Sequence, residues 1–272
     1  MSDTNTQINK EQDVSQTPGQ AGEAYSGIIE LRQYTLKPGR RDELIALFEE
    51  HFIEGQEQAG AHVLGQFRRR NRPDQFVWLR GFTDMEARRL ALQNFYYGPI
   101  WREHRDAAND TMIDSDNVLL FKPASRTGEF HLELNNRPGK DVPEAAGGII
   151  IATLYTFATP VEAKFVELFE KGVAPVQRVA GAAISGYFVT EASENTFPAL
   201  PVREGEHIFA WFASFADEAA YESYLSALSE SDAWTAALTP TLQEWLARPQ
   251  EVLELLPARR SLMRHHSSAH NI

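Results

Sequence analysis

Residues 56–67, QEQAGAHVLGQF, return later in the chain as residues 177–188, QRVAGAAISGYF. A glutamine, two glycines and a phenylalanine keep the same spacing in both stretches. The matching pairs are Gln56 with Gln177, Gly60 with Gly181, Gly65 with Gly186, and Phe67 with Phe188. A match at fixed spacing is typical of an internal repeat, and it indicates that the fold consists of two copies of one unit.

The repeat extends beyond this stretch in both directions. Upstream, Tyr34 recurs as Tyr155 and Leu47-Phe48 as Leu168-Phe169; downstream, Trp78, Phe82, Asp84 and Trp101 recur as Trp211, Phe215, Asp217 and Trp234. The spacing grows once, just before Ile208, which places an inserted loop at about residues 192–206 of the second copy. Because hairpin loops end at the rim of a sheet, we expect this loop at one mouth of the space between the copies.

The composition excludes several classes of function. The chain has 272 residues, a formal net charge of −12 and no cysteine. Binding to nucleic acid or to an anionic membrane needs a cationic face, so neither partner is expected. Without cysteine there are no disulfides, thiolate metal ligands or cysteine nucleophiles. The sequence also lacks the HExxH, glycine-rich phosphate-loop, GxSxG and EF-hand patterns of common enzyme and nucleotide-binding classes.

The repeat also defines the domain organisation. Residues 1–26 are mostly polar, and we expect a disordered tail without a secretory or mitochondrial signal. No apolar run reaches the roughly 20 residues of a membrane span, which predicts a cytoplasmic protein. We then expect a first domain at 27–122, a linker at 123–146, a second domain at 147–258 and a loose tail at 259–272.

Each copy is predicted to run strand, helix, strand, strand, helix, strand. In the first copy the apolar pattern predicts strands at 28–35, 63–68, 76–82 and 118–121, a helix over 44–60 and a helix capped by Asp84. In the second copy Thr159–Glu162 has the pattern of a capping box. A βαββαβ unit carries both helices on one face of its sheet and leaves an aromatic face to cover. The predicted fold is therefore α+β, with two tandem ferredoxin-like units packed sheet to sheet as an intramolecular α/β barrel.

Several stretches of the first copy resemble the NIPSNAP family. They are IELRQYTLKPG at 29–39, LFEEH at 47–51, GAHVLG at 60–65 and FVWLRGF at 76–82, followed by Trp101. The likeness covers about 28–122 and extends more weakly over 149–257. It implies the dimeric α/β barrel type of ferredoxin-like fold. Relatives of that fold include haem enzymes, cofactor-free monooxygenases and small stress or signalling proteins, so the resemblance implies no single activity.

Strand alternation selects the candidate site residues. If Ile29 and Leu31 lie under the helices, the alternate positions face the space between the two sheets. By this parity the inward residues are Glu30, Arg32, Tyr34, Gln66, Trp78 and Arg80. The same positions in the second copy carry uncharged residues such as Ile151, Thr153 and Ala213, so we expect the functional site in the first half.

These side chains suggest a pocket for an anion. Arg32 and Arg80 are predicted to bind a carboxylate or phosphate, and Glu30 to act as the catalytic residue by moving a proton. Tyr34, Gln66 and Trp78 are predicted to complete the ligand-binding wall. The alternative is a salt-bridge network that only neutralises buried charge.

No metal site and no cofactor are predicted. Haem is an alternative that requires a histidine, such as His51 or His104, directed into the cavity. His265, His266 and His270 lie in the predicted tail, where we assign them no function.

Two classes of function follow from this interpretation. In the first, the protein binds a small anionic or aromatic metabolite between its sheets, and oxygenase- or lyase-type chemistry there stays open. In the second, it is a non-enzymatic scaffold or interaction protein whose inter-sheet space is a filled core. The sequence leaves a homo-oligomer open in either case, because the outer edges of a pseudo-dimer can still associate.

Overall fold

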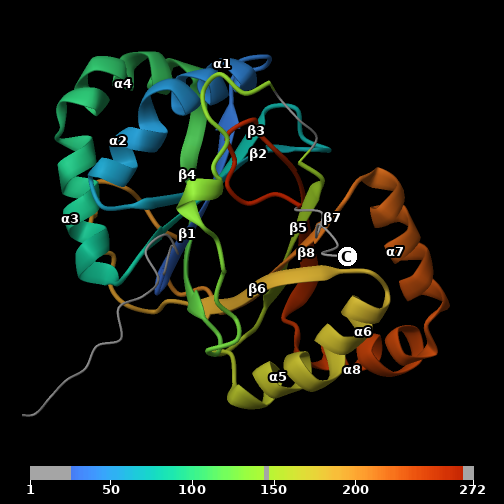
Figure 1. The fold of residues 1–272 in the computed structure, drawn as a ribbon. Helices are drawn as coiled ribbons and strands as arrows, with labels where there is room; N and C mark the ends of the chain where they lie inside the picture. Colours follow the sequence, from blue (N-terminus) through green and yellow to red (C-terminus); the bar gives the residue numbers. More distant parts are fainter. Residues whose placement is uncertain (1–25, 144–146, 266–272) are drawn as a thin grey trace, which may run out of the picture.

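The chain folds into a closed antiparallel barrel of eight strands surrounded by helices (Figure 1). The computed structural model describes residues 26–143 and 147–265. The first half contains β1 (Ile28–Leu36), α1 (Arg41–Leu47), α2 (Ile53–Gln58), β2 (His62–Arg69), β3 (Gln75–Phe82), α3 (Met85–Tyr96), α4 (Pro99–Thr111) and β4 (Met112–Pro123). The second half contains β5 (Ile149–Thr156), α5 (Ala163–Leu168), α6 (Ala174–Val179), β6 (Ala183–Thr190), β7 (Ile208–Phe215), α7 (Glu218–Glu230), α8 (Thr239–Trp245) and β8 (Arg248–Pro257).

The order of strands around the barrel is β1-β3-β2-β8-β5-β7-β6-β4. The strands of each half are therefore neighbours, and two seams join the halves. At one seam Phe67 of β2 pairs with Pro257 of β8, and at the other Phe121 of β4 pairs with Thr190 of β6. The predicted intramolecular α/β barrel is confirmed, and the seams make it a single closed barrel.

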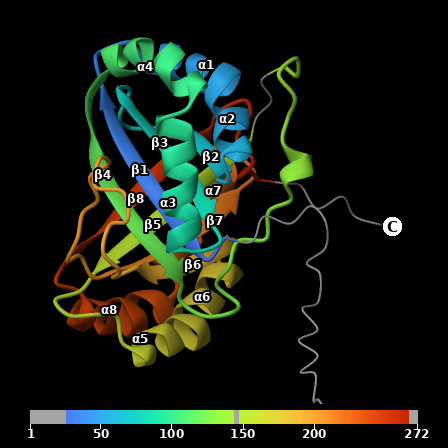
Figure 2. The same ribbon diagram turned by 90° about the vertical axis from the view of Figure 1, so that its left-hand side faces the viewer.

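The helices form two groups on the outside of this barrel. Figure 1 shows α1–α4 beside the strands of the first half and α5–α8 beside those of the second, and Figure 2 shows α3 lying across the outer face of β1 and β3. Every strand thus has one face toward the barrel interior and one toward solvent or helices. This arrangement provides two layers of core for each half.

Local signals in the sequence set the ends of some helices. Asp84 caps α3 by accepting a hydrogen bond from the Ala87 amide at 2.7 Å, as predicted, and Asp217 caps α7 through Ala220 at 2.8 Å. The capping box predicted at Thr159–Glu162 does not form, because α5 starts only at Ala163 and has no side-chain cap. Both halves insert a π-helical turn at the same point of the repeat, at Phe48–Phe52 (η1) and Phe169–Val173 (η3).

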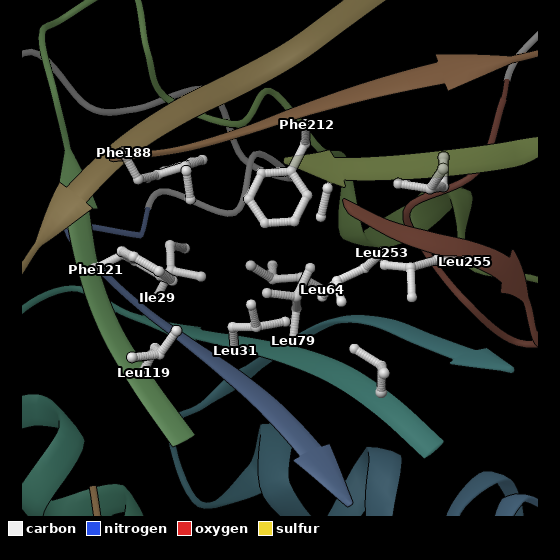
Figure 3. Close-up of a cluster of buried hydrophobic side chains, with 14 of the residues drawn as sticks. Ile29, Leu31, Leu64, Leu79, Leu119, Phe121, Phe188, Phe212, Leu253 and Leu255 are labelled. Carbon is white, nitrogen blue, oxygen red and sulfur yellow. The ribbon is translucent and has the colours of Figure 1, made fainter. Parts of the chain in front are cut away.

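The barrel interior is filled with apolar side chains from all eight strands (Figure 3). An eight-stranded barrel is just wide enough for its own side chains to fill it. The labelled members of this cluster are Ile29, Leu31, Leu64, Leu79, Leu119, Phe121, Phe188, Phe212, Leu253 and Leu255. The space between the sheets, where the sequence predicted a ligand, is therefore a hydrophobic core.

Two segments outside the strands complete this core. Phe130 of the predicted linker and Met263 of the predicted tail both join the cluster inside the barrel. The prediction of a loose tail is wrong for residues 259–265, because Leu262 and Met263 are each only 2% exposed and Ser261 is fully buried. An isolated Leu-Met pair has no periodicity, so its burial left no pattern to find. The predicted tails at 1–25 and 266–272 lie outside the described residues.

We expect Met263→Ala to lower the free energy of unfolding by about 2–5 kcal/mol, because it leaves a cavity inside a closed barrel. Denaturant unfolding followed by circular dichroism measures this change. Val179→Ala is the control, since Val179 is 90% exposed and its truncation should leave stability unchanged. Equal stabilities for Met263→Ala and wild type would show that the C-terminal segment does not pack in the barrel.

Candidate functional site

The six predicted site residues lie together, but on the opposite face from the one predicted. Ile29 and Leu31 line the barrel interior, whereas Glu30 contacts Arg88 of α3 in the layer beneath the helices. Tyr34 and Trp78 belong to the aromatic core under the first group of helices, and Arg32, Gln66 and Arg80 alternate with barrel residues on their strands. The parity argument was wrong because both strand faces are buried, so apolar residues do not identify the face under the helices.

Glu30 is the centre of a fully buried charge cluster. Its Oε2 accepts hydrogen bonds from Arg80 Nε at 2.5 Å and Arg32 Nη1 at 3.2 Å, and its Oε1 accepts one from Arg88 Nε at 2.6 Å. Burial alone would raise the pKa of Glu30, but Arg80, Arg88 and Arg32 outweigh it and hold the pKa well below its ordinary value. The carboxylate is thus permanently ionised near neutral pH, which does not suit a proton-transfer role.

Uncharged groups hold the guanidinium groups in place. Arg80 Nη1 donates to Gln56 Oε1 at 2.9 Å, and Arg32 Nε donates to the Tyr34 hydroxyl at 2.9 Å. The guanidinium carbons of Arg80 and Arg32 lie 5.0 Å and 5.6 Å from the centre of the Trp78 ring, a distance that gives a cation–π attraction. The aromatic frame therefore packs and also orients the charges.

Gln66 makes none of these contacts through its side chain. It is fully buried as the cross-strand neighbour of Trp78, and neither atom of its amide has a partner among the described residues. Its role as a ligand contact stays a prediction, as do the roles of Arg32, Tyr34, Trp78 and Arg80.

The sequence did not point to Arg88 or Gln56 as members of the cluster, nor to the contact of the inserted loop with Arg88. Arg88 lies on the buried face of α3 with Ala91, Leu92 and Phe95, and an arginine at helical spacing within an apolar stripe was a usable signal. Gln56 recurs in the repeat, yet it was interpreted only as a marker of the fold.

The inserted loop of the second half was predicted at a mouth of the inter-sheet space. Instead it crosses onto the first half and packs on α3. Arg88 Nη1 donates to Asn195 Oδ1 at 3.0 Å and to Thr196 Oγ1 at 3.2 Å, and Phe197 stacks on Tyr96 with ring centres 6.0 Å apart. The loop therefore covers the Arg88 side of the charge cluster beneath the helices.

The equivalent position in the second half is an open pocket of about 440 Å³. The repeat places Ile151, Thr153, Ala213 and Tyr221 where the first half has Glu30, Arg32, Arg80 and Arg88. The pocket is lined by the sheet and by α7, α8 and the π-helical turn Ala233–Leu238 (η4), with Tyr155, Gln177, Trp211, Tyr221, Tyr224 and Trp234 among its walls. Thr153 and Ala213 are shorter than the arginines at the equivalent positions of the first half, and the space that those arginines would fill remains open.

The lining of the pocket carries no charged side chain among the described residues. None of the described residues that line it is Asp, Glu, Lys, Arg or His. Burial raises the pKa of both Tyr155 and Tyr224, so their hydroxyls stay protonated at neutral pH. The Tyr224 hydroxyl donates to Gln177 Oε1, and Trp211, only 2% exposed, has no acceptor of good geometry for its indole N–H among the described residues. The walls therefore combine aromatic surface with neutral hydrogen-bonding groups.

The histidines lie elsewhere. The rings of His51 and His104 stack on each other with centres 3.8 Å apart, on η1 and α4, and neither lines the pocket of the second half.

Within the described residues, no three or more acidic or histidine side chains are grouped to hold a metal ion. No helix in that part of the chain is long and apolar enough to span a membrane.

Replacing Glu30 by Gln should destabilise the protein by about 3–5 kcal/mol, because three buried guanidinium groups then lack their counter-charge. Urea unfolding at pH 7 measures the loss. Glu103→Gln, at a side chain that is 75% exposed, is the control and should change little. A fully stable Glu30→Gln protein would mean that the cluster does not depend on this carboxylate.

The same carboxylate predicts an acid dependence of stability. Since the folded-state pKa of Glu30 is lower than its ordinary value of 4.5, its contribution is complete above that value and is lost as the pH falls below it. Wild type should therefore lose more stability than Glu30→Gln between pH 5 and pH 3. Parallel stability curves for the two proteins over this range would contradict the ion-pair account.

Comparisons with known proteins agree with this fold. Residues 29–126 match the NIPSNAP family. A "putative monooxygenase" from Fusobacterium nucleatum is 10% identical, with a TM-score of 0.51, over 90% of this chain and 100% of that one. An anthrone oxidase-like protein is 10% identical, with a TM-score of 0.52, over 90% of this chain and 99% of that one. At these identities the similarity shows a shared fold alone.

A third solved structure is closer in sequence. A NIPSNAP-like domain protein from Burkholderia xenovorans is 24% identical, over 43% of this chain and 88% of that one, with a TM-score of 0.32. A comparison with curated proteins gives no match. The similarity to the NIPSNAP family is therefore carried by residues 29–126, in the first half of the chain.

Proposed function

We propose that the protein binds a small, uncharged, planar aromatic molecule in the pocket beneath the helices of the second half. The observation that carries this proposal is the contrast between two equivalent positions. The first half fills its position with Glu30 and three arginines, whereas the second half leaves about 440 Å³ open. This volume is in the range of small-molecule sites, which extends from about 300 to 1,000 Å³.

The lining supports the class of ligand. Tyr155, Trp211, Tyr224 and Trp234 offer aromatic faces and edges on which a flat ring can stack. Ser229 and Gln250 are exposed members of the lining, and their side chains offer hydrogen bonds to a carbonyl or hydroxyl group. A charged ligand would lose its hydration without gaining a counter-charge, so it should be excluded.

The proposal includes the origin of the pocket. We interpret residues 147–258 as a second NIPSNAP-like domain and each half as a ferredoxin-like βαββαβ unit. The matching order of elements, the equivalent π-helical turns and the aligned Trp78 and Trp211 support this interpretation. The same position would then have a structural role in the first half, where the charge cluster fills it, and a ligand-binding role in the second half, where the pocket is open.

Oxidation of the bound aromatic by O₂ is a candidate reaction. One neighbour in fold is named an anthrone oxidase-like protein, and anthrone is an uncharged planar aromatic ketone that matches the proposed ligand class. The pocket residues would bind and orient such a ring. The competing function is a non-enzymatic scaffold, which the filled barrel interior favours.

Isothermal titration calorimetry with 2-naphthol tests the binding proposal. Ser229 is an exposed pocket residue of α7 that corresponds to Tyr96 of the first half, so Ser229→Tyr should fill the pocket and weaken binding roughly tenfold or more. Ser226→Tyr makes the same change on the same helix outside the pocket lining and should bind like wild type.

The anion 2-naphthoate should bind much more weakly than 2-naphthol, since the pocket offers no cation. If 2-naphthol and other neutral aromatics give no heat, or if both tyrosine variants bind like wild type, the pocket has no such function and the scaffold alternative gains support. Oxygen uptake by the complex then decides whether binding leads to reaction.

A further inference from the structure

The charge cluster of the first half contains more positive than negative groups. Arg32, Arg80 and Arg88 all form their ion pairs with Glu30, so three guanidinium groups share one carboxylate. All four side chains are at most 1% exposed. Buried charge is costly unless it is balanced, and this cluster is not balanced by its own carboxylate.

Two of the guanidinium groups also have unused donors. The Nη2 atoms of Arg80 and Arg88 are buried and have no hydrogen-bond partner among the described residues. Both arginines bind Glu30 through Nε, so their two Nη atoms, the outer nitrogens, carry the donors that Glu30 does not use. A buried donor without an acceptor costs stability, which makes these nitrogens candidates for recognition.

The groups that cover this part of the cluster are neutral oxygens of the inserted loop. Asn195 Oδ1 and Thr196 Oγ1 both accept from Arg88 Nη1. Thr196 Oγ1 also donates to the Met85 carbonyl at 3.2 Å, and Phe197 packs beside Ala91 and Leu92. The loop therefore supplies Arg88 with weak acceptors where an anion would supply strong ones.

We propose that the outer nitrogens of Arg80 and Arg88 form a second binding site, for a small oxyanion such as a carboxylate or phosphate, under the loop at residues 192–206. The oxyanion displaces Asn195 and Thr196 from Arg88 and accepts from the nitrogens that are now unpartnered. A guanidinium group presents several donors in a fixed plane, which suits the several oxygens of such an anion. An excess of positive charge in a protein of net charge −12 makes this position a favourable one for an anion.

The site is distinct from the pocket of the second half in location and in chemistry. It lies on α3 and β3 of the first half, it is cationic, and its cover comes from the other half of the chain. Ser229→Tyr, which fills the second-half pocket, should leave oxyanion binding unchanged. Failure of the aromatic-binding proposal would therefore not affect this one.

Calorimetric titration with inorganic phosphate and, separately, with acetate at constant ionic strength tests the proposal. The double variant Asn195→Ala/Thr196→Ala removes the competing oxygens and should bind the preferred anion roughly tenfold more tightly than wild type. Arg88→Met removes the fork and should weaken binding at least about tenfold. Arg105→Met, at an exposed arginine paired with Asp106, is the matched control and should leave affinity unchanged.

The loop variant keeps the test informative if Arg88→Met does not fold, since Asn195 and Thr196 are both partly exposed and lie outside the core. Arg88→Lys then replaces it, because lysine retains the charge without the fork. Preference for phosphate or for acetate supports the site and identifies the class of ligand. No binding of either anion by wild type and the loop variant, or equal binding by Arg88→Met and wild type, would overturn the proposal.

Discussion

Closure of the barrel buries both faces of the central strands, and the other features of the molecule depend on this constraint. One face meets the opposite sheet across an interior that eight strands leave just large enough for side chains. The other face meets the helices of its own half. The interior is filled with apolar side chains, and both the charge cluster around Glu30 and the pocket of about 440 Å³ lie in the layers beneath the helices.

Those two layers carry different side chains at equivalent positions of the sequence. In the first half, arginine side chains from β1, β3 and α3 converge on Glu30 and fill the layer with a charged network. In the second half, Thr153 and Ala213 replace Arg32 and Arg80, and Tyr221 replaces Arg88. Tyr34 and Trp78 pack in the core of the first layer, as Tyr155 and Trp211 do in the second, so the two layers share an aromatic frame and differ in the residues around it. The inserted loop connects the two layers, because a segment of the second half closes over the network of the first.

The sequence predicted the architecture well and the site only in part. Two in-register copies predicted the intramolecular barrel, and Asp84 predicted the start of α3. Alternation grouped Glu30, Arg32 and Arg80 correctly, since residues two apart on a strand share a face. Strand alternation could not identify which face this is, because both faces of the strands are buried. The prediction therefore placed the cluster inside the barrel, whereas it lies beneath the helices. Arg88 and Met263 come from segments whose contacts are tertiary, so strand periodicity held no information about them.

The most direct test of this account is the ¹⁹F NMR spectrum of the protein labelled with 5-fluorotryptophan and titrated with 2-naphthol. Trp78 and Trp211 are both only 2% exposed, so exposure alone does not distinguish them. Only Trp211 and Trp234 line the open pocket, whereas Trp78 and Trp101 pack in the filled layer of the first half. The account predicts that the resonances of Trp211 and Trp234 shift on titration while those of Trp78 and Trp101 stay in place. Shifts at Trp78 and Trp101 with none at Trp211 and Trp234 would contradict it.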